Sequence, residues 1–136
     1  MIIVDDALSL EALAGRRARF GAADDEVVAT TWGFHYRLVR ALTDTERTGR
    51  LSGGVPETLL QEALHPRSSD LQILDPRTVT GVAAAMAVRH GLNLLAAELV
   101  GSAVHHNATV ALSSTNVGRA WPAAFQAEGV TLRVVG

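Results

Sequence analysis

Two adjacent carboxylates, Asp5 and Asp6, directly follow an apolar segment at residues 1–4. Four apolar residues in succession are typical of a strand that is covered on both faces of a parallel sheet. Open α/β sheets bind their ligands at the carboxyl ends of such strands. Because hard divalent cations prefer oxygen ligands, Asp5 is a candidate metal ligand if further acids lie nearby in the fold.

A second candidate site is the polar segment at residues 113–116, which follows the apolar segment 109–112. Its side chains are those of Ser113, Ser114, Thr115 and Asn116. Hydroxyl groups and free backbone N–H groups ahead of a helix can bind an anion. The same residue types also serve as ordinary helix caps, so both interpretations stay open.

The adjacent residues His105 and His106 also carry metal-ligand chemistry. Neighbours on a helix point about 100° apart and rarely share one ion. Histidines near the carboxyl end of a helix interact favourably with the helix dipole. We therefore expect this pair to mark a helix end rather than a metal site.

Five arginines form two groups that could contact RNA phosphates. They are Arg16, Arg17 and Arg19 in the first group and Arg47 and Arg50 in the second. Acidic residues lie close to both groups in the sequence, so an ordinary solvated surface is the expected state. The aromatic residues Trp32, Phe34 and Tyr36 could stack on a base or pack against a dimer partner. Phe34 is expected in the core, and Trp32 is expected to be the most exposed of the three.

Composition places the chain of 136 residues in the class of single globular domains, spanning residues 1–136. Apolar residues make up 48% and charged residues 19%, with a formal net charge of −2. This charge gives no general attraction to nucleic acid, so RNA binding would need a local patch. The chain has no cysteine, no apolar run long enough for a membrane helix, and a strand-like start instead of a signal sequence. We expect a cytoplasmic protein without a membrane partner.

Alternating strands and helices are expected along the chain. Apolar runs predict strands at residues 1–4, 71–74, 109–112 and 130–135. Apolar periodicity and capping residues, among them Asp75 and Asn93, predict helices at residues 7–14, 31–42, 56–64, 76–90, 94–105 and 122–127. Residues 43–54 are expected to form a loop. Strands separated by helices imply right-handed crossovers and therefore a three-layer α/β/α fold around a mostly parallel sheet.

The order of several segments resembles that of a known family. The segments are residues 2–5, 29–31, 38–42, 71–75, 90–97, 108–118 and 127–130. Together they resemble the PIN domain, and within it the single-domain ribonucleases of the VapC toxin type. The resemblance covers nearly the whole chain and implies the same α/β/α fold.

The resemblance implies a site of about four carboxylates that hold one or two Mg²⁺ or Mn²⁺ ions for RNA hydrolysis. Only the first of the four positions carries an acid in this sequence, Asp5. The other three positions fall on Arg37, Ala96 and Ser114. Neither Asp6 nor Glu98 is expected to substitute. Asp6 should face away if the strand persists, and Glu98 lies about 200° around a helix from Ala96.

These departures predict a degenerate, VapC-like pseudoenzyme that acts by binding RNA or a protein partner, such as an antitoxin-like peptide. No cofactor is expected. In place of a metal, Arg37 is predicted to form an ion pair with Asp5. The alternative is that Arg37 faces solvent and Asp5 accepts backbone N–H groups at a helix start. The predicted binding residues are Asp5, Asp6, Arg37, Ser113, Ser114, Thr115 and Asn116.

Two other functions stay open. The first is an active Mg²⁺- or Mn²⁺-dependent ribonuclease, the toxin of a toxin–antitoxin pair, with Asp5 as its one assigned ligand. The second is a regulatory or structural homodimer without nucleic acid. Because PIN toxins commonly dimerise, the resemblance implies a homodimer in each case.

Overall fold

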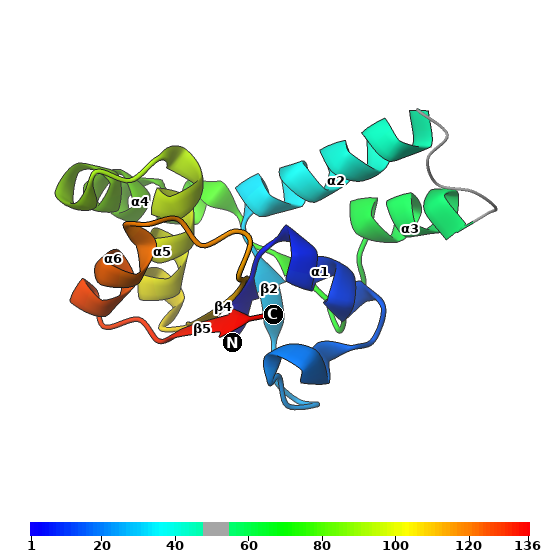
Figure 1. Ribbon diagram of the computed structural model, residues 1–136, viewed down its shortest axis with the longest axis horizontal. Helices are drawn as coiled ribbons and strands as arrows, with labels where there is room; N and C mark the ends of the chain where they lie inside the picture. The colour runs from blue at the N-terminus through cyan, green and yellow to red at the C-terminus, as the bar shows by residue number, and fades with distance from the viewer. Residues whose placement is uncertain (48–54) are drawn as a thin grey trace.

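The computed structural model describes residues 1–47 and 55–136 and contains a five-stranded sheet with helices on both faces (Figure 1). The strands are β1 (Ile2–Val4), β2 (Val28–Thr30), β3 (Gln72–Ile73), β4 (Thr109–Ser113) and β5 (Leu132–Val135). They are ordered β3-β2-β1-β4-β5, and every neighbouring pair is parallel. The predicted three-layer α/β/α fold is therefore confirmed.

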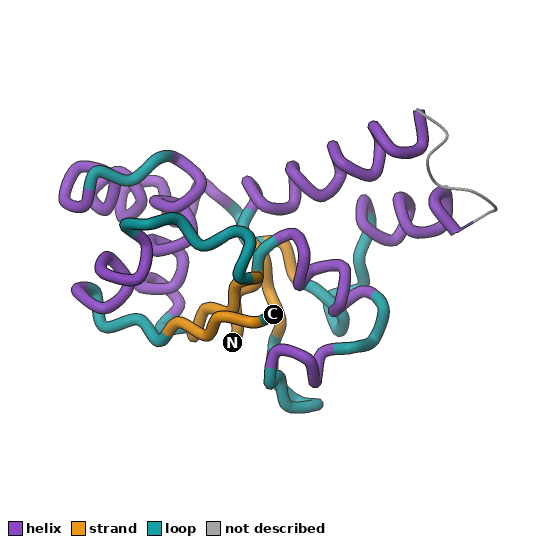
Figure 2. Tube along the Cα trace, in the orientation of Figure 1, coloured by secondary structure: helices purple, strands orange, loops and turns teal. Residues whose placement is uncertain are grey.

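Six α-helices and one short 3-10 helix occur in the described residues (Figure 2). The α-helices are α1 (Asp6–Leu13), α2 (Trp32–Arg47), α3 (Val55–Leu64), α4 (Pro76–His90), α5 (Leu94–His106) and α6 (Trp121–Ala127). The 3-10 helix, η1 (Arg17–Phe20), follows α1. None of these helices alone is long and apolar enough to cross a membrane. Helices α4 and α5 meet the criteria of length and apolar composition only when they are counted together, and the chain bends by 118° between them.

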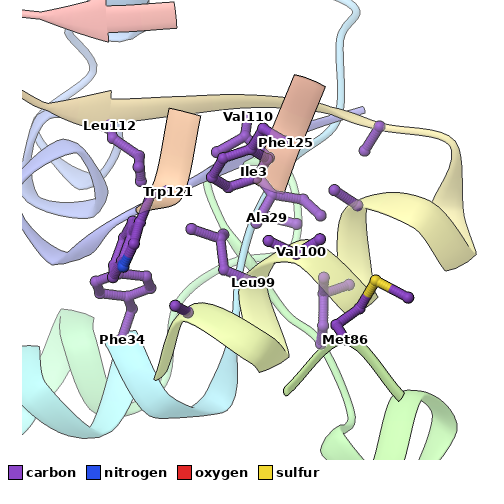
Figure 3. Packing of buried hydrophobic residues seen from close by; sticks show 14 residues of the cluster. Ile3, Ala29, Phe34, Met86, Leu99, Val100, Val110, Leu112, Trp121 and Phe125 are labelled. Carbon is purple, nitrogen blue, oxygen red and sulfur yellow. The ribbon is translucent and has the colours of Figure 1, made fainter. Parts of the chain in front are cut away.

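The core lies on both faces of the sheet, because alternate residues of β1 point to opposite sides. Ile3 belongs to a cluster with side chains of α4, α5 and α6, among them Met86 and Phe125 (Figure 3). Ile2 and Val4 belong to a second cluster, formed with α1 and η1. The central strand is thus buried on both faces, which explains why all its residues are apolar.

Helices α2 and α3 lie side by side and extend away from the sheet (Figure 1). Leu38 and Leu42 of α2 pack there against Ala63 of α3, with partly buried leucines of α1 around them. Phe34, nearer the start of α2, instead reaches the main core and meets the buried Trp121 edge to face, with 6.5 Å between the ring centroids. The core position predicted for Phe34 is confirmed.

The predicted caps of α4 and α5 are also confirmed. The Asp75 carboxylate accepts a hydrogen bond from the Arg77 N–H (3.0 Å), and the Asn93 side chain accepts one from the Ala96 N–H (2.9 Å). At the other end of α5, Asn107 has a φ of +50°, a conformation that asparagine tolerates better than most residues. Local sequence therefore sets the bounds of both helices.

The sequence prediction missed one strand and shortened one helix. Strand β2 has only three residues, too few for apolar alternation to show, and its chain passes directly into α2. Helix α2 continues to Arg47, where a loop from residue 43 was predicted. Thr43 and Thr45 donate their hydroxyls to the carbonyl groups of Val39 and Ala41, so these polar residues are satisfied within the helix. The rest of the predicted loop, residues 48–54, lies outside the described residues.

Candidate functional site

Asp5 lies where β1 ends and caps the start of α1. Its backbone is extended (φ −79°, ψ −174°), and its Oδ1 accepts a hydrogen bond from the Leu8 N–H at 2.9 Å. The residue is fully buried, with 0% of its surface exposed. This is the geometry of an N-cap, in which a carboxylate satisfies an otherwise unpaired helix N–H group.

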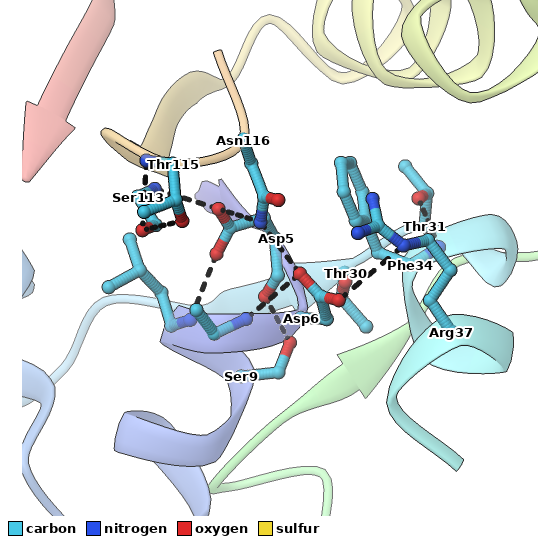
Figure 4. Close-up of polar contacts among 12 residues, drawn as sticks. Asp5, Asp6, Ser9, Thr30, Thr31, Phe34, Arg37, Ser113, Thr115 and Asn116 are labelled. Carbon is cyan, nitrogen blue, oxygen red and sulfur yellow. Dashed lines mark hydrogen bonds and ion pairs between the residues drawn. The ribbon is translucent and has the colours of Figure 1, made fainter. Parts of the chain in front are cut away.

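The second carboxylate oxygen of Asp5 faces the loop after β4 (Figure 4). Oδ2 accepts hydrogen bonds from the Ser113 N–H at 2.7 Å and from Asn116 Nδ2 at 2.8 Å. The parallel pairing of β1 with β4 brings this loop to Asp5, because Val4 lies opposite Ala111. The Asp5 carboxylate therefore has three N–H donors, which together satisfy a buried acid.

Asp6 lies beside Asp5 instead of facing away, so that expectation is wrong. The strand ends at Val4 and a helix begins at Asp6, which removes the alternation on which the expectation depended. Asn116 Nδ2 donates to Asp6 Oδ1 at 2.8 Å as well as to Asp5. Turning the amide would place its oxygen against two carboxylates, so the nitrogen is the atom that fits between them.

Arg37 forms its ion pair with Asp6, not with Asp5 as predicted. Its Nε lies 3.6 Å from Asp6 Oδ2, and its guanidinium carbon lies 5.7 Å from the centre of the Phe34 ring. Asp5 is buried beneath the helix start and its oxygens already accept N–H groups, whereas Asp6 is nearer the surface. The predicted alternative, in which Asp5 accepts backbone N–H groups, describes Asp5 correctly.

The other predicted site residues contribute little to this cluster. Ser113 provides its backbone N–H, while its hydroxyl bonds to that of Thr115 at 2.9 Å. Ser114 donates its backbone N–H to Val135, and Ala96 lies in the core. The structure thus brings Asp5, Asp6, Arg37 and Asn116 together through their side chains. Because β4 ends at Ser113, one residue later than predicted, Asn116 and not Ser114 reaches the acids.

These residues do not fit the Mg²⁺ or Mn²⁺ ions that the family resemblance implies. Such ions need several oxygen ligands, with one or more free carboxylates among them. Here both Asp5 oxygens accept N–H groups, and Asp6 is neutralised by Arg37. Among the residues whose side chains the structure describes, 1–45 and 58–136, no three acidic, histidine or cysteine side chains lie close enough to share an ion.

A cavity of about 700 Å³ opens beside this cluster, along α2. Two cations and two acids line it, namely Arg37, Arg40, Asp6 and Asp44, together with Tyr36. The Tyr36 ring stacks on that of Trp32, with 5.7 Å between the centroids and 14° between the planes. Both side chains are about half exposed (50% for Trp32 and 52% for Tyr36). Trp32 is therefore exposed, as predicted, but Tyr36 is exposed to the same extent, so Trp32 is not the most exposed of the three aromatic residues.

The first arginine group is engaged within the protein. Arg16 and Arg19 pair with Glu11, and the Arg16 guanidinium lowers the pKa of the Glu11 carboxyl below its ordinary value. Arg17 donates to the backbone carbonyl groups of Ala23, at 2.7 Å, and Glu26. These contacts leave few of its donors for RNA. The second group, Arg47 with Arg50, lies outside the residues whose side chains are described.

His105 and His106 lie at the carboxyl end of α5, as expected. Their rings meet edge to face, with 4.8 Å between the centroids. Burial lowers the pKa of His106, and the charge of His105 lowers it further. Among the described residues, no further acidic, histidine or cysteine side chain joins the pair in a group that could hold a metal ion.

Together, the fold and the strand-end cluster define an α/β/α domain whose buried acid at the end of β1 accepts three hydrogen bonds. No family model and no curated protein sequence matches the chain. Among solved structures, the chain is similar to the crystal structure of PAE2754 from Pyrobaculum aerophilum. The TM-score is 0.62 at 20% sequence identity, and the match covers 96% of this chain and 89% of that one. At this identity the similarity shows a shared fold.

Proposed function

We propose that this chain is a PIN-like domain that acts by binding a partner rather than by hydrolysing RNA. The observation that supports the proposal best is the state of Asp5, which is fully buried and accepts three N–H groups. Metal-dependent hydrolysis of a phosphodiester needs carboxylates free to hold the ion. In this proposal the former metal position has become a structural hydrogen-bond network.

The partner that the exposed face of α2 fits best is single-stranded RNA. Trp32, Tyr36 and Arg40 recur at every fourth residue and therefore share one face of the helix. Arg37 lines the same cavity as Tyr36 and Arg40. Aromatic rings that stack on bases, combined with cations that contact phosphates, are the usual means of binding a single strand. The proposal keeps the cytoplasmic location predicted from the sequence.

A protein partner, either an antitoxin-like peptide or a second copy of the chain, is the second candidate. Val88 of α4 and Leu94 of α5 are large apolar residues with 88% and 82% of their surfaces exposed. Leu94 lines the same cavity as the half-exposed Trp32, and exposed apolar and aromatic residues are typical of protein interfaces. In a homodimer, these residues would pack against a partner.

The absence of metal chemistry can be tested by thermal unfolding with Mn²⁺. We expect the melting temperature to stay unchanged up to millimolar Mn²⁺, because the Asp5 and Asp6 carboxylates are already occupied. An ion at about 100 times its Kd would instead stabilise the fold by about 2.7 kcal/mol. Asp6→Asn is the matched control. If the melting temperature of the wild type rises with the Mn²⁺ concentration and Asp6→Asn abolishes this rise, the proposal is wrong. The metal-dependent ribonuclease then becomes the better interpretation.

RNA binding can be tested by titrating a fluorescent 12-nucleotide single strand at several salt concentrations. We expect Trp32→Ala or Tyr36→Ala to weaken binding about tenfold, since stacking on one base is worth about 1–3 kcal/mol. The logarithm of the binding constant falls linearly with the logarithm of the salt concentration. Arg40→Gln should reduce the magnitude of this slope by about 0.7, which is the contribution of one phosphate contact on a single strand.

The matched control is Arg67→Gln, which removes an exposed arginine between α3 and β3 and should leave binding unchanged. If the wild type does not bind RNA at low salt, the RNA proposal is wrong. Light scattering on the same sample would then show whether the chain forms a homodimer, as the second candidate requires.

A further inference from the structure

A cavity of about 430 Å³ lies between α4, α5 and the start of α2. Nine of the ten residues that line it are uncharged, and small side chains such as Ala83, Ala84 and Ala97 make up much of its wall. The cavity exists because these positions hold alanine where larger residues would fill the space. An apolar cavity of this size accommodates a small organic ligand.

Glu98 is the only charged residue in this wall. It is almost completely buried, with 8% of its surface exposed, and its Oε1 accepts a hydrogen bond from the Gly33 N–H at 2.8 Å. In the part of the chain that the structure describes, no arginine or histidine forms an ion pair with it. A largely buried carboxylate that accepts one neutral donor is stabilised further by a cation beside it, which supplies the opposite charge.

Trp32 forms another side of the same cavity. The indole stacks on Tyr36 and is half exposed. An aromatic face attracts a cation within about 6 Å of its centre, most strongly where water is partly excluded. The cavity therefore combines an apolar wall, which favours an apolar stem, with a carboxylate and an indole, which both favour a cation.

We propose that this cavity binds a small organic cation, namely a primary ammonium group carried on a short apolar stem. The ammonium group would pair with Glu98 beside the Trp32 ring, and the stem would lie against the alanines of α4 and α5. The site uses none of the strand-end acids. It shares only Trp32 with the RNA-binding proposal, so variants at Glu98 and Ala84 test this site separately.

The probe for this site is phenethylammonium, with binding measured by calorimetry and by Trp32 fluorescence. We expect saturable 1:1 binding that changes the emission, because Trp32 is the exposed one of the two tryptophans. The neutral analogue 2-phenylethanol and the anion 3-phenylpropionate should bind at least about tenfold more weakly. Glu98→Gln should weaken the binding of phenethylammonium by a similar factor. The side-chain oxygen of the glutamine can still accept the hydrogen bond from the Gly33 N–H.

A second variant, Ala84→Leu, tests the cavity without changing a buried charge. Residue 84 is exposed and lines the cavity, so the larger side chain should fold normally and reduce binding by occupying the space. If Glu98→Gln does not fold, Ala84→Leu and the neutral analogue still decide the question. No saturable binding, equal binding of amine and alcohol, or unchanged binding in the variants that fold would each overturn the proposal. Tighter binding of N-acetyl-lysine amide would also overturn it, in favour of a lysine on a partner protein.

Discussion

Replacing Asp5 with alanine is expected to lower the free energy of unfolding by roughly 3–5 kcal/mol. The substitution removes the N-cap of α1 and leaves the Leu8 N–H, the Ser113 N–H and the Asn116 amide without their acceptor. Each buried donor left without a partner costs about 1–3 kcal/mol. Equilibrium unfolding in urea, followed by circular dichroism, measures the loss.

The matched control is Asp5→Asn, which keeps the size of the side chain. One oxygen can still accept the Leu8 N–H, but the new amide group faces the donors of the loop after β4. This variant should also lose stability, which separates lost hydrogen bonds from lost packing. If Asp5 were instead a strained acid kept for metal binding, its removal would leave stability unchanged or raise it, and the proposed structural role would be wrong.

Gly101→Ala is the second substitution with a large expected effect. A Cβ atom at this position of α5 would lie 2.9 Å from the backbone N and Cα of Ala83 in α4. Backbone atoms cannot rotate away as a side chain can, so the two helices would have to separate. We expect a loss of about 1–3 kcal/mol in the free energy of unfolding, measured as above.

Gly81→Ala in α4 provides the contrasting control. A Cβ atom there meets no atom within 4 Å, so the helix should gain about 0.5–1 kcal/mol from the better helix former. A Gly101→Ala protein as stable as the wild type would contradict the close approach of α4 and α5 at this position.

Much of the fold could be predicted because capping residues and apolar runs within a few positions of each other indicate where its helices and strands lie. The bounds of α4 and α5 follow from Asp75, Asn93 and Asn107, whose side chains or backbone act within a few residues. The buried central strand follows from its uninterrupted apolar residues. Strand β2 could not be predicted in the same way, because three residues do not display a period and their pairing with β1 is a tertiary contact.

The site was harder to predict because it depends on where two strands end. Asp5 could be placed at a strand end from sequence alone, but the ion pair of Arg37 was assigned one residue too early. The role of Asn116 gave no local signal, since its partners Asp5 and Asp6 lie more than a hundred residues earlier. Spacing within a loop does not reveal which of its polar side chains turns toward a distant acid.

The position of β1 at the centre of the sheet also governs when this protein can fold during synthesis. Its neighbour β4 and the Ser113 N–H that bonds to Asp5 lie 108 residues further along the chain. A ribosome adds about a hundred residues before β1 can meet this neighbour, and contacts between such distant residues form slowly. Until then, the three apolar residues of β1 lack their partner along this edge, and an unpaired apolar edge is open to pairing with other chains.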